Sequence, residues 1–166
     1  MMRVIVLTIS DGAAAGARQD LSGPAVERLC LDQGWSVLAI EVLPDEQADI
    51  ARRLAELADD AVAELVVTTG GTGVAARDVT PEATRSVIEK ELPGLAELMR
   101  AEGLKKTRRA ALSRGLAGVR GRTLVVNVPG SPKGAVESLN AILDLVPHVV
   151  DLLQGRTEHR EESKRG

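Results

Sequence analysis

A glycine-rich segment, TGGTG, directly follows an apolar, β-branched run and is the first place where chemistry is expected. Glycine tolerates positive φ and lets backbone amides come close to a ligand, which suits phosphate binding. The same pattern is equally typical of a tight turn from a strand into a helix. The Gly-Lys-Ser/Thr of a P-loop and the spacing GxGxxG, the two commonest nucleotide fingerprints, are both missing. The segment consists of Thr69, Gly70, Gly71, Thr72 and Gly73.

Two aspartates at the ends of expected strands are candidate metal ligands. Asp45 follows the strand expected over residues 36–43, and Asp78 lies two residues before Thr80, the expected N-cap of a helix. Mg²⁺ prefers one or two carboxylates together with substrate phosphates. Each acid also has an ordinary structural explanation, because a helix dipole stabilises a carboxylate near its N-terminus. Their occurrence beside the glycine-rich segment favours the metal site.

A second segment, PGSPK, combines free backbone amides at a helix start with a cation in the first turn. Lys133 opposes the helix dipole there, so an anionic ligand explains it better than solvation alone. Ser113 and Arg114 offer a further hydroxyl and a guanidinium fork for phosphate. They lie in the basic region 100–120, which has no assigned structure. The segment consists of Pro129, Gly130, Ser131, Pro132 and Lys133.

The elements that would position these residues alternate between strands and helices. Strands are expected over residues 3–9, 36–43, 64–68 and 123–128. Residues 11–20 are rich in glycine and alanine and are interpreted as a mobile loop. Helices are expected over about 23–33, with Ser22 as N-cap, over about 46–60, from Thr80, over 95–99, and from Ser131 through Val146.

This alternation predicts right-handed βαβ units and hence an α/β fold of three layers, α/β/α, around a mostly parallel sheet. Ligands bind such folds outside the carboxyl ends of the strands. The unusual residues follow those ends: Ser10 and Asp11 after the first strand, Asp45 after the second, and the two glycine-containing segments after the third and fourth. Their expected meeting at one edge of the sheet is the strongest argument from the residues for a site.

Composition and charge exclude several classes of function. A net charge of −3 and the absence of Phe and Tyr argue against a nucleic-acid-binding protein. No apolar run approaches the ~20 residues that span a bilayer. The single cysteine fits a reducing compartment, which predicts a cytoplasmic protein, and with two distant histidines it forms no zinc pattern. The length predicts one domain over residues 1–154, followed by a charged flexible tail over 155–166.

Seven segments spread along the chain form a specific combined pattern. They are LTISD at 7–11, DLSGP at 20–24, LPDE at 43–46, TTGGTG at 68–73, RDVTPEAT at 77–84, LSR at 112–114 and VNVPGSPKGAVE at 126–137. In this order they resemble the MogA/MoaB family of molybdenum cofactor biosynthesis proteins, whose plant and animal counterparts include the G domain of gephyrin. The resemblance covers residues 2–153, nearly the whole chain.

The resemblance implies a function and a set of site residues. Family members are α/β/α proteins, usually homotrimers, that use ATP and Mg²⁺ to adenylylate molybdopterin and release pyrophosphate. The nucleophile would be the terminal phosphate of molybdopterin itself, so no protein base is required. Asp45 and Asp78 match the catalytic acids that bind the metal. Residues implied to bind the nucleotide or the pterin are Ser10, Asp11, Ser22, Gly23, Thr69, Gly70, Gly71, Thr72, Gly73, Ser113, Pro129, Gly130, Ser131 and Lys133.

The family has an adenylyltransferase branch and a MoaB-type branch in which some members lack the acid after the second strand. Both acid motifs, PDE and RDVTPEAT, are intact in this chain, which favours the active branch. The alternatives are a non-catalytic pterin-binding or carrier protein and a generic nucleotide-binding module. A separate metal-insertion protein is the expected partner. The trimer interface is expected on the apolar stripe of the last helix or in the region 100–120.

Overall fold

Six strands form one mixed sheet in the computed structural model, which describes residues 1–156 of the chain. The strand order is β2-β1-β3-β6-β5-β4. The first four strands in this order are parallel, whereas β5 runs antiparallel to β6 and β4 antiparallel to β5. The strands are β1 (Arg3–Ile9), β2 (Ser36–Leu43), β3 (Leu65–Thr69), β4 (Lys90–Glu91), β5 (Ala117–Arg120) and β6 (Thr123–Val128).

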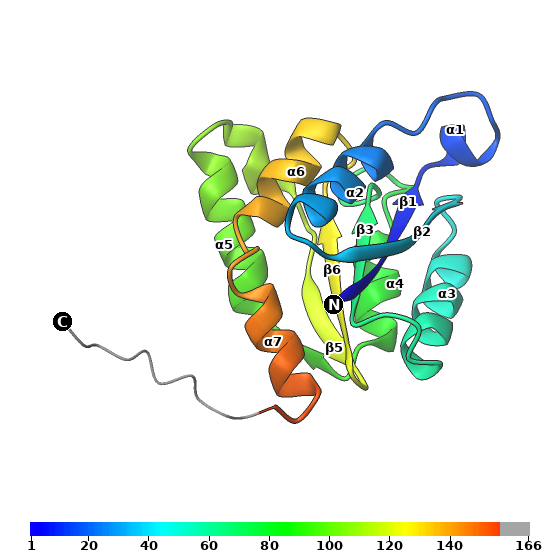
Figure 1. Cartoon of the computed structure of the whole chain (residues 1–166). Helices are drawn as coiled ribbons and strands as arrows, with labels where there is room; N and C mark the ends of the chain where they lie inside the picture. The colour runs from blue at the N-terminus through cyan, green and yellow to red at the C-terminus, as the bar shows by residue number, and fades with distance from the viewer. Residues whose placement is uncertain (157–166) are drawn as a thin grey trace.

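Helices cover both faces of this sheet, so the predicted three-layer α/β/α fold is confirmed (Figure 1). Helices α2, α5, α6 and α7 lie on one face, and α3 and α4 lie on the other. The single turn α1 lies beyond the end of β1. The helices are α1 (Asp11–Ala14), α2 (Ser22–Asp32), α3 (Gln47–Asp59), α4 (Thr80–Val87), α5 (Pro93–Leu104), the 3₁₀ helix η1 (Arg108–Leu112), α6 (Pro132–Asn140) and α7 (Val146–Leu153).

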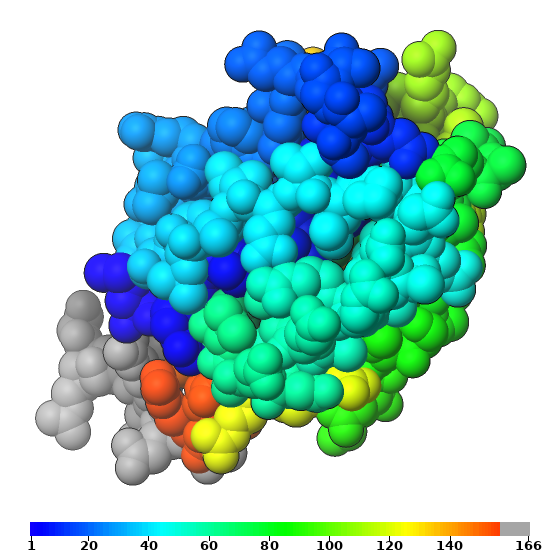
Figure 2. Space-filling model, turned by 90° about the vertical axis from the view of Figure 1, so that its right-hand side faces the viewer, coloured from blue at the N-terminus to red at the C-terminus, as the bar shows by residue number. Residues whose placement is uncertain are grey.

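The side-chain alternation of the central strands divides the core into two clusters. Successive residues of a strand point to opposite faces. In β1, Val4 and Val6 therefore pack with α2 and α7, while Ile5 and Leu7 pack against α3. All four side chains are buried because helices cover both faces, which explains why this strand is a continuous apolar run. One edge strand of the sheet is β2, seen with α3 and the α1 segment in Figure 2, and the other is β4.

Several element boundaries differ from the sequence-based expectations. The segment 11–20, expected to be a loop, begins with the helical turn α1. The unassigned region 100–120 contains the end of α5, η1 and β5. The single helix expected from Ser131 through Val146 is two helices, because turns occupy residues 141–145 and Pro147 lies in the first turn of α7. A proline lacks the amide hydrogen that a helix interior requires, but it fits a first turn.

Two predicted helix caps are also wrong. Ser22 and Thr80 are the first helical residues of α2 and α4, and neither helix has a side-chain hydrogen bond from its N-cap residue. Asp20 caps the start of α2 instead, because its carboxylate accepts a hydrogen bond from the Gly23 amide at 2.9 Å. Residues 157–166, most of the predicted tail, lie outside the described residues. Within residues 1–156, no helix combines the length and the apolar character needed to cross a membrane.

Candidate active site

The four parallel strands end at one edge of the sheet, where a hollow of about 730 Å³ lies. This first hollow is bounded by the ends of β1 and β3, the α1 segment and the starts of α2 and α6. Its lining brings together residues that are far apart in the sequence. The predicted site residues that line it are Ser10, Ser22, Asp45, Thr69, Gly70, Gly71, Asp78, Gly130 and Ser131.

Residues 70–73, called the glycine loop below, have every backbone carbonyl bound by a protein donor. Thr80 binds the first two carbonyls, with its hydroxyl at 2.9 Å and its amide at 3.1 Å. Arg114 binds the last two, with its amide at 2.9 Å and its Nε at 2.7 Å. The loop is therefore held to the protein through all four of its carbonyls and through one amide, that of Gly70, which donates to Val128 O at 3.1 Å.

Among the residues that the structure describes, the backbone amides of the glycine loop, unlike its carbonyls, are mostly without protein partners. Within residues 1–156, the amides of Gly71, Thr72 and Gly73 have no hydrogen-bond acceptor. Gly70 and Gly71 have φ values of 104° and 70°, a region that other residues rarely adopt. Three neighbouring unbound amides form a local concentration of positive partial charge, which suits a phosphate or another anion.

Asp45 is fixed by a reciprocal pair of hydrogen bonds with Asp11. The Asp11 amide donates to Asp45 Oδ2 at 2.9 Å, and the Asp45 amide donates to Asp11 Oδ1 at 3.0 Å. Arg77 binds both carboxylate oxygens of Asp11, at 2.6 and 3.0 Å, and also reaches Glu46 at 2.9 Å. The carboxylate of Asp11 is thus occupied by Arg77 and the Asp45 amide, and Asp11 lies beside the first hollow rather than in its lining.

The two neighbouring acids have opposite pKa shifts. Hydrogen bonds from Arg77 and from the Asp45 amide lower the pKa of Asp11. Burial raises the pKa of Asp45, and the negative charges of Asp11 and Asp78 raise it further, against the lowering effects of the Asp11 amide and of the Arg77 charge. Within residues 1–156, no side chain donates a hydrogen bond to the Asp45 carboxylate, and an external cation would stabilise its ionised form.

Asp45 and Asp78 flank the glycine loop. A Cβ atom added to Gly71 would lie 3.2 Å from Asp45 Oδ1, and one added to Gly73 would lie 2.7 Å from Asp78 Oδ2. Asp78 Oδ2 also accepts the Ala75 amide at 2.9 Å. The unbound amides and the two carboxylates consequently share one small region at the sheet edge.

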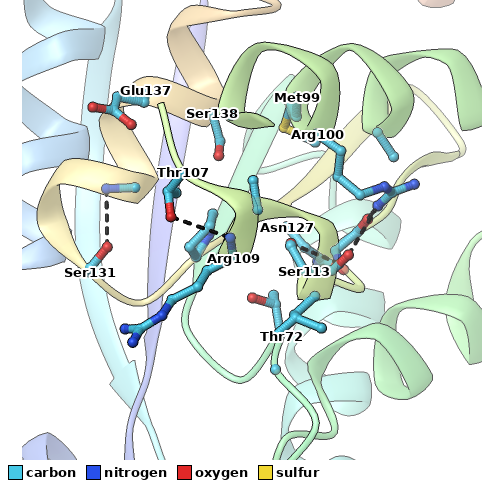
Figure 3. Close-up of a pocket in the computed structure, with 18 residues that line it drawn as sticks. Thr72, Met99, Arg100, Thr107, Arg109, Ser113, Asn127, Ser131, Glu137 and Ser138 are labelled. Atoms are coloured by element: carbon cyan, nitrogen blue, oxygen red, sulfur yellow. Dashed lines mark hydrogen bonds between the residues drawn. The ribbon is translucent and has the colours of Figure 1, made fainter. Parts of the chain in front are cut away.

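A second hollow, of about 450 Å³, lies on the other side of Ser131 (Figure 3). It is enclosed by α5, η1 and the start of α6, and Ser131 lines both hollows. Arg100 from α5 donates to the carbonyls of Ser113 and Gly115, at 3.4 and 3.0 Å. The predicted site residues that line this second hollow are Thr72, Gly73, Ser113, Pro129 and Ser131.

Three predicted ligand-binding residues line neither hollow. Asp11 is bound to Arg77, as described above. Gly23 is buried, and a Cβ there would overlap the side chains of Asp20 and Thr8, which explains why a glycine is required. The Lys133 ammonium lies 3.9 Å from Glu137 with 85% of its side chain exposed. The guanidinium of Arg114, considered above as a phosphate fork, is bound to backbone carbonyls and to Glu82.

The acidic groups alone do not form a complete metal site. Within residues 1–156, no cluster of three or more His, Cys, Asp or Glu side chains could hold a metal ion. Asp45 and Asp78 offer two carboxylates, which fit Mg²⁺ only if phosphate oxygens and water complete the coordination. The raised pKa of Asp45, caused mainly by burial, is consistent with that donor set, because a cation would favour the ionised form.

Comparison with known proteins decides the family. Residues 5–148 match the family model described as "Probable molybdopterin binding domain". The chain belongs to the MogA/MoaB family. It is 44% identical over 152 residues to the molybdopterin adenylyltransferase of Helicobacter pylori strain J99, covering 90% of this chain and 86% of that protein. It is 39% identical over 168 residues to the molybdopterin adenylyltransferase of Escherichia coli strain K12, covering 93% and 86%.

A solved structure agrees with this assignment to the MogA/MoaB family. The molybdopterin biosynthesis enzyme MoaB of Thermus thermophilus superimposes with a TM-score of 0.88 at 52% identity. The match covers 93% of this chain and 98% of that chain. The predicted membership of the family is confirmed, and the fold extends over nearly all of both proteins.

Sequence reasoning missed several residues that line the hollows of this family member. In the first hollow, Asp20 accepts hydrogen bonds from the Thr8 hydroxyl at 2.8 Å and from the Gly23 amide. Arg18 also lines it. The available signal was position, since Arg18 and Asp20 both lie between the first strand and the first long helix. In the second hollow, Arg109 lies on η1, an element that no sequence pattern predicted.

Proposed function

We propose that this chain adenylylates molybdopterin with ATP and releases pyrophosphate. The observation that carries the proposal is the glycine loop, whose unbound amides lie between Asp45 and Asp78. This arrangement is a phosphate-binding site with two carboxylates available for a cation. It occurs in a member of a family that includes the adenylyltransferases of H. pylori and E. coli.

The reaction requires little covalent chemistry from the protein. A terminal phosphate oxygen of molybdopterin attacks the α-phosphorus of ATP and forms a phosphoanhydride bond. The bond from that phosphorus to the β-phosphate oxygen breaks, and pyrophosphate leaves. Because the attacking phosphate is already an anion at neutral pH, no side chain needs to remove a proton. Catalysis then consists of positioning the reactants and neutralising charge.

The glycine loop amides supply the neutralising donors of the protein itself. Backbone amides that are already oriented stabilise developing negative charge without reorganising during the reaction. Gly71, Thr72 and Gly73 offer three such donors, and the carbonyls on the same loop are fixed by Thr80 and Arg114. We assign these amides to the phosphoryl oxygens at the reacting centre.

Asp45 and Asp78 are the residues that would hold Mg²⁺ in this proposal. The mutual repulsion of these two carboxylates helps to raise the pKa of Asp45, and a divalent cation would offset that repulsion. Substrate phosphates would supply the remaining oxygen ligands. When bound, the cation would neutralise phosphate charge in the reaction.

The two hollows give each substrate its own space. Both adjoin Ser131, and the glycine loop contributes Gly70 and Gly71 to the first and Thr72 and Gly73 to the second. One substrate in each hollow would bring the two phosphate groups together over this loop. The proposed reaction needs this geometry, because its nucleophile and its electrophile are both phosphates.

The proposal also includes an assembly, a cellular location and a partner. We propose a homotrimer, as in the relatives that the sequence motifs resemble. We place the protein in the cytoplasm, because its one cysteine, Cys30, is buried and has no second cysteine with which to form a disulfide in the chain. A separate metal-insertion protein would then receive the adenylylated product.

The test is direct measurement of the product. The purified chain is mixed with molybdopterin, ATP and Mg²⁺, and the reaction is followed by mass spectrometry and by pyrophosphate release. We expect adenylylated molybdopterin and an equal amount of pyrophosphate, and no product when a chelator removes Mg²⁺. Retention of unmodified molybdopterin without either product would identify a non-catalytic carrier and contradict the proposal.

A further inference from the structure

Arg114 connects three segments that meet at the glycine loop. Its amide donates to Thr72 O at 2.9 Å and its Nε to Gly73 O at 2.7 Å. Its Nη2 donates to Asp78 O at 2.7 Å, and its Nη1 donates to the Glu82 carboxylate. One residue therefore joins the second half of the loop to the backbone of an acid and to the first turn of α4.

These contacts determine which groups of the loop remain available. A carbonyl and the following amide belong to the same rigid peptide unit, so fixing one fixes the direction of the other. The carbonyl of Thr72 shares its peptide unit with the Gly73 amide, one of the unbound donors. The backbone amide of Arg114, which any residue at this position would keep, holds that carbonyl and so fixes the direction of the free amide. The guanidinium adds the bond to the next carbonyl, that of Gly73, and so holds the other side of the same residue.

The same guanidinium sets the distance between the loop and Asp78. Nε and Nη2 belong to one planar fork, and they bind the carbonyls of Gly73 and Asp78. The rigid fork thus holds these two residues at a fixed separation. The Asp78 carboxylate, which also accepts the Ala75 amide, is carried on a backbone that Arg114 anchors.

An ordinary surface ion pair does not account for this arrangement. An exposed pair between Arg114 and Glu82 would contribute little to stability, and a lysine could replace the arginine. Here the guanidinium uses three donors, of which one goes to a carboxylate and two go to backbone carbonyls around the candidate active site. The planar fork can bind the carbonyls of Gly73 and Asp78 at the same time, and this depends on its shape rather than on its charge.

We propose that Arg114 is the positioning residue of this site, which aligns the free amides of the glycine loop with the Asp78 carboxylate. The role assigned to the loop rests on the proposed function, in that the loop binds substrate phosphates. Arg114 itself touches no substrate in this account. It acts through the loop and through the backbone of Asp78.

The experiment compares Arg114→Lys, which keeps the charge but removes the fork, with Arg114→Ala. Arg120→Lys is the matched control, because Arg120 also joins a carboxylate, Asp59, to a backbone carbonyl, that of Val87, at the opposite end of β5. Two readouts are measured in each variant. One is the kinetics of adenylyl transfer, given as the single-turnover rate and the KM. The other is the change in the NMR chemical shifts of the Gly71 and Gly73 amides when inorganic pyrophosphate is added.

We expect Arg114→Lys and Arg114→Ala to lose transfer by a similar factor, about 100-fold, mainly in the maximal rate. The pyrophosphate-induced amide shifts should be reduced in both, while Arg120→Lys should behave as the wild type. Transfer within twofold of wild type in Arg114→Lys, with unchanged amide shifts, would overturn the inference. If the wild type transfers no adenylyl group, the proposed function fails, and the amide shifts still decide the role of Arg114.

Discussion

At the residue scale, Gly73 is the glycine-loop residue at which an added methyl group would come nearest to an acid side chain. Its φ is not in the positive range, so alanine fits the backbone, but a Cβ there would lie 2.7 Å from Asp78 Oδ2. We expect Gly73→Ala to displace the Asp78 carboxylate and to lower adenylyl transfer about 10- to 100-fold. The free energy of unfolding should change by less than about 1 kcal/mol, because the carboxylate can move toward solvent.

Gly94→Ala is the matched control, since Gly94 also lacks a positive φ and a Cβ there meets nothing within 4 Å. Steady-state kinetics and thermal unfolding of both variants provide the comparison. If Gly73→Ala transferred the adenylyl group at the wild-type rate, the contact between the loop and Asp78 would have no part in the reaction.

We expect the negative charge of Asp45 to lower the stability of the free protein while it serves the proposed reaction. Burial and neighbouring charges raise its pKa in the folded state. An acid with a raised folded pKa contributes stability below its unfolded pKa of about 3.9, and this contribution is lost as the pH rises through the folded pKa. At pH 7 its charge therefore opposes folding. We expect Asp45→Asn to raise the Tm at pH 7 by roughly 1–3 °C, and to give no gain near pH 3.

Differential scanning calorimetry at the two pH values measures this effect. Asp144→Asn, which removes an exposed carboxylate between α6 and α7, is the control measured in parallel. A lower Tm for Asp45→Asn at pH 7 would show that its carboxylate stabilises the free protein, contrary to the environment described here.

The sequence reveals some residue roles and hides others for a physical reason. Asp45 and Asp78 could be proposed because each follows an expected parallel strand, and such strand ends meet at one edge. The role of Arg114 could not be predicted, because its partners Gly73 and Asp78 are 41 and 36 positions away. The ion pair between Asp11 and Arg77 could not be predicted for the same reason, because the two residues are 66 positions apart.

At the element scale, Asn127 joins β6 to β3 and to α4. Its Nδ2 donates to Thr68 Oγ1 at 2.9 Å and to Thr84 Oγ1 at 3.0 Å, and its Oδ1 accepts the Leu116 amide at 3.3 Å. The side chain is buried. We expect Asn127→Ala to lower the free energy of unfolding by about 2–3 kcal/mol, because buried polar groups would lose their partners.

Urea denaturation measures this loss, with Asn140→Ala at the exposed end of α6 as the control. The control should stay within about 0.5 kcal/mol of the wild type. Equal stabilities of the two variants would mean that water replaces the lost hydrogen bonds of Asn127 without cost.

The accuracy of the predicted elements depended on length and burial. Three of the four parallel strands, β1, β3 and β6, are almost continuously buried runs, which made them easy to find. Strands β4 and β5 were missed, because β4 is only two exposed residues long and β5 is only four residues long and includes a glycine. Both are held by pairing with a neighbouring strand rather than by a pattern of their own. Such pairing is non-local information that no short segment contains.

At the scale of the whole molecule, the proposed trimer needs an apolar surface. The stripe of the last helix is not available, because Leu139, Ile142 and Val146 are fully buried in the core. Leu98 and Leu104 of α5 are 40% and 49% exposed. This surface borders the second of the two regions that the sequence suggested for the interface.

Sedimentation equilibrium at micromolar concentration should give a mass three times the 17.5 kDa of the chain. We expect Leu104→Lys to shift this mass toward the monomer, because a charge would be buried in the interface. Leu31→Lys, at an exposed position of α2, is the control. A monomeric wild type would refute the proposed assembly.

The central claim is that Asp45 and Asp78 hold a cation against phosphates bound by the glycine loop. Asp78→Asn and Asp45→Asn keep the size and hydrogen-bonding capacity of the side chains but remove their charge. The decisive measurement is single-turnover adenylylation of molybdopterin, with molybdopterin binding measured on the same samples. We predict that transfer falls by about 100-fold or more in each variant, since the charge that organises the cation is lost, while pterin binding persists. Transfer at the wild-type rate in both variants would contradict the account.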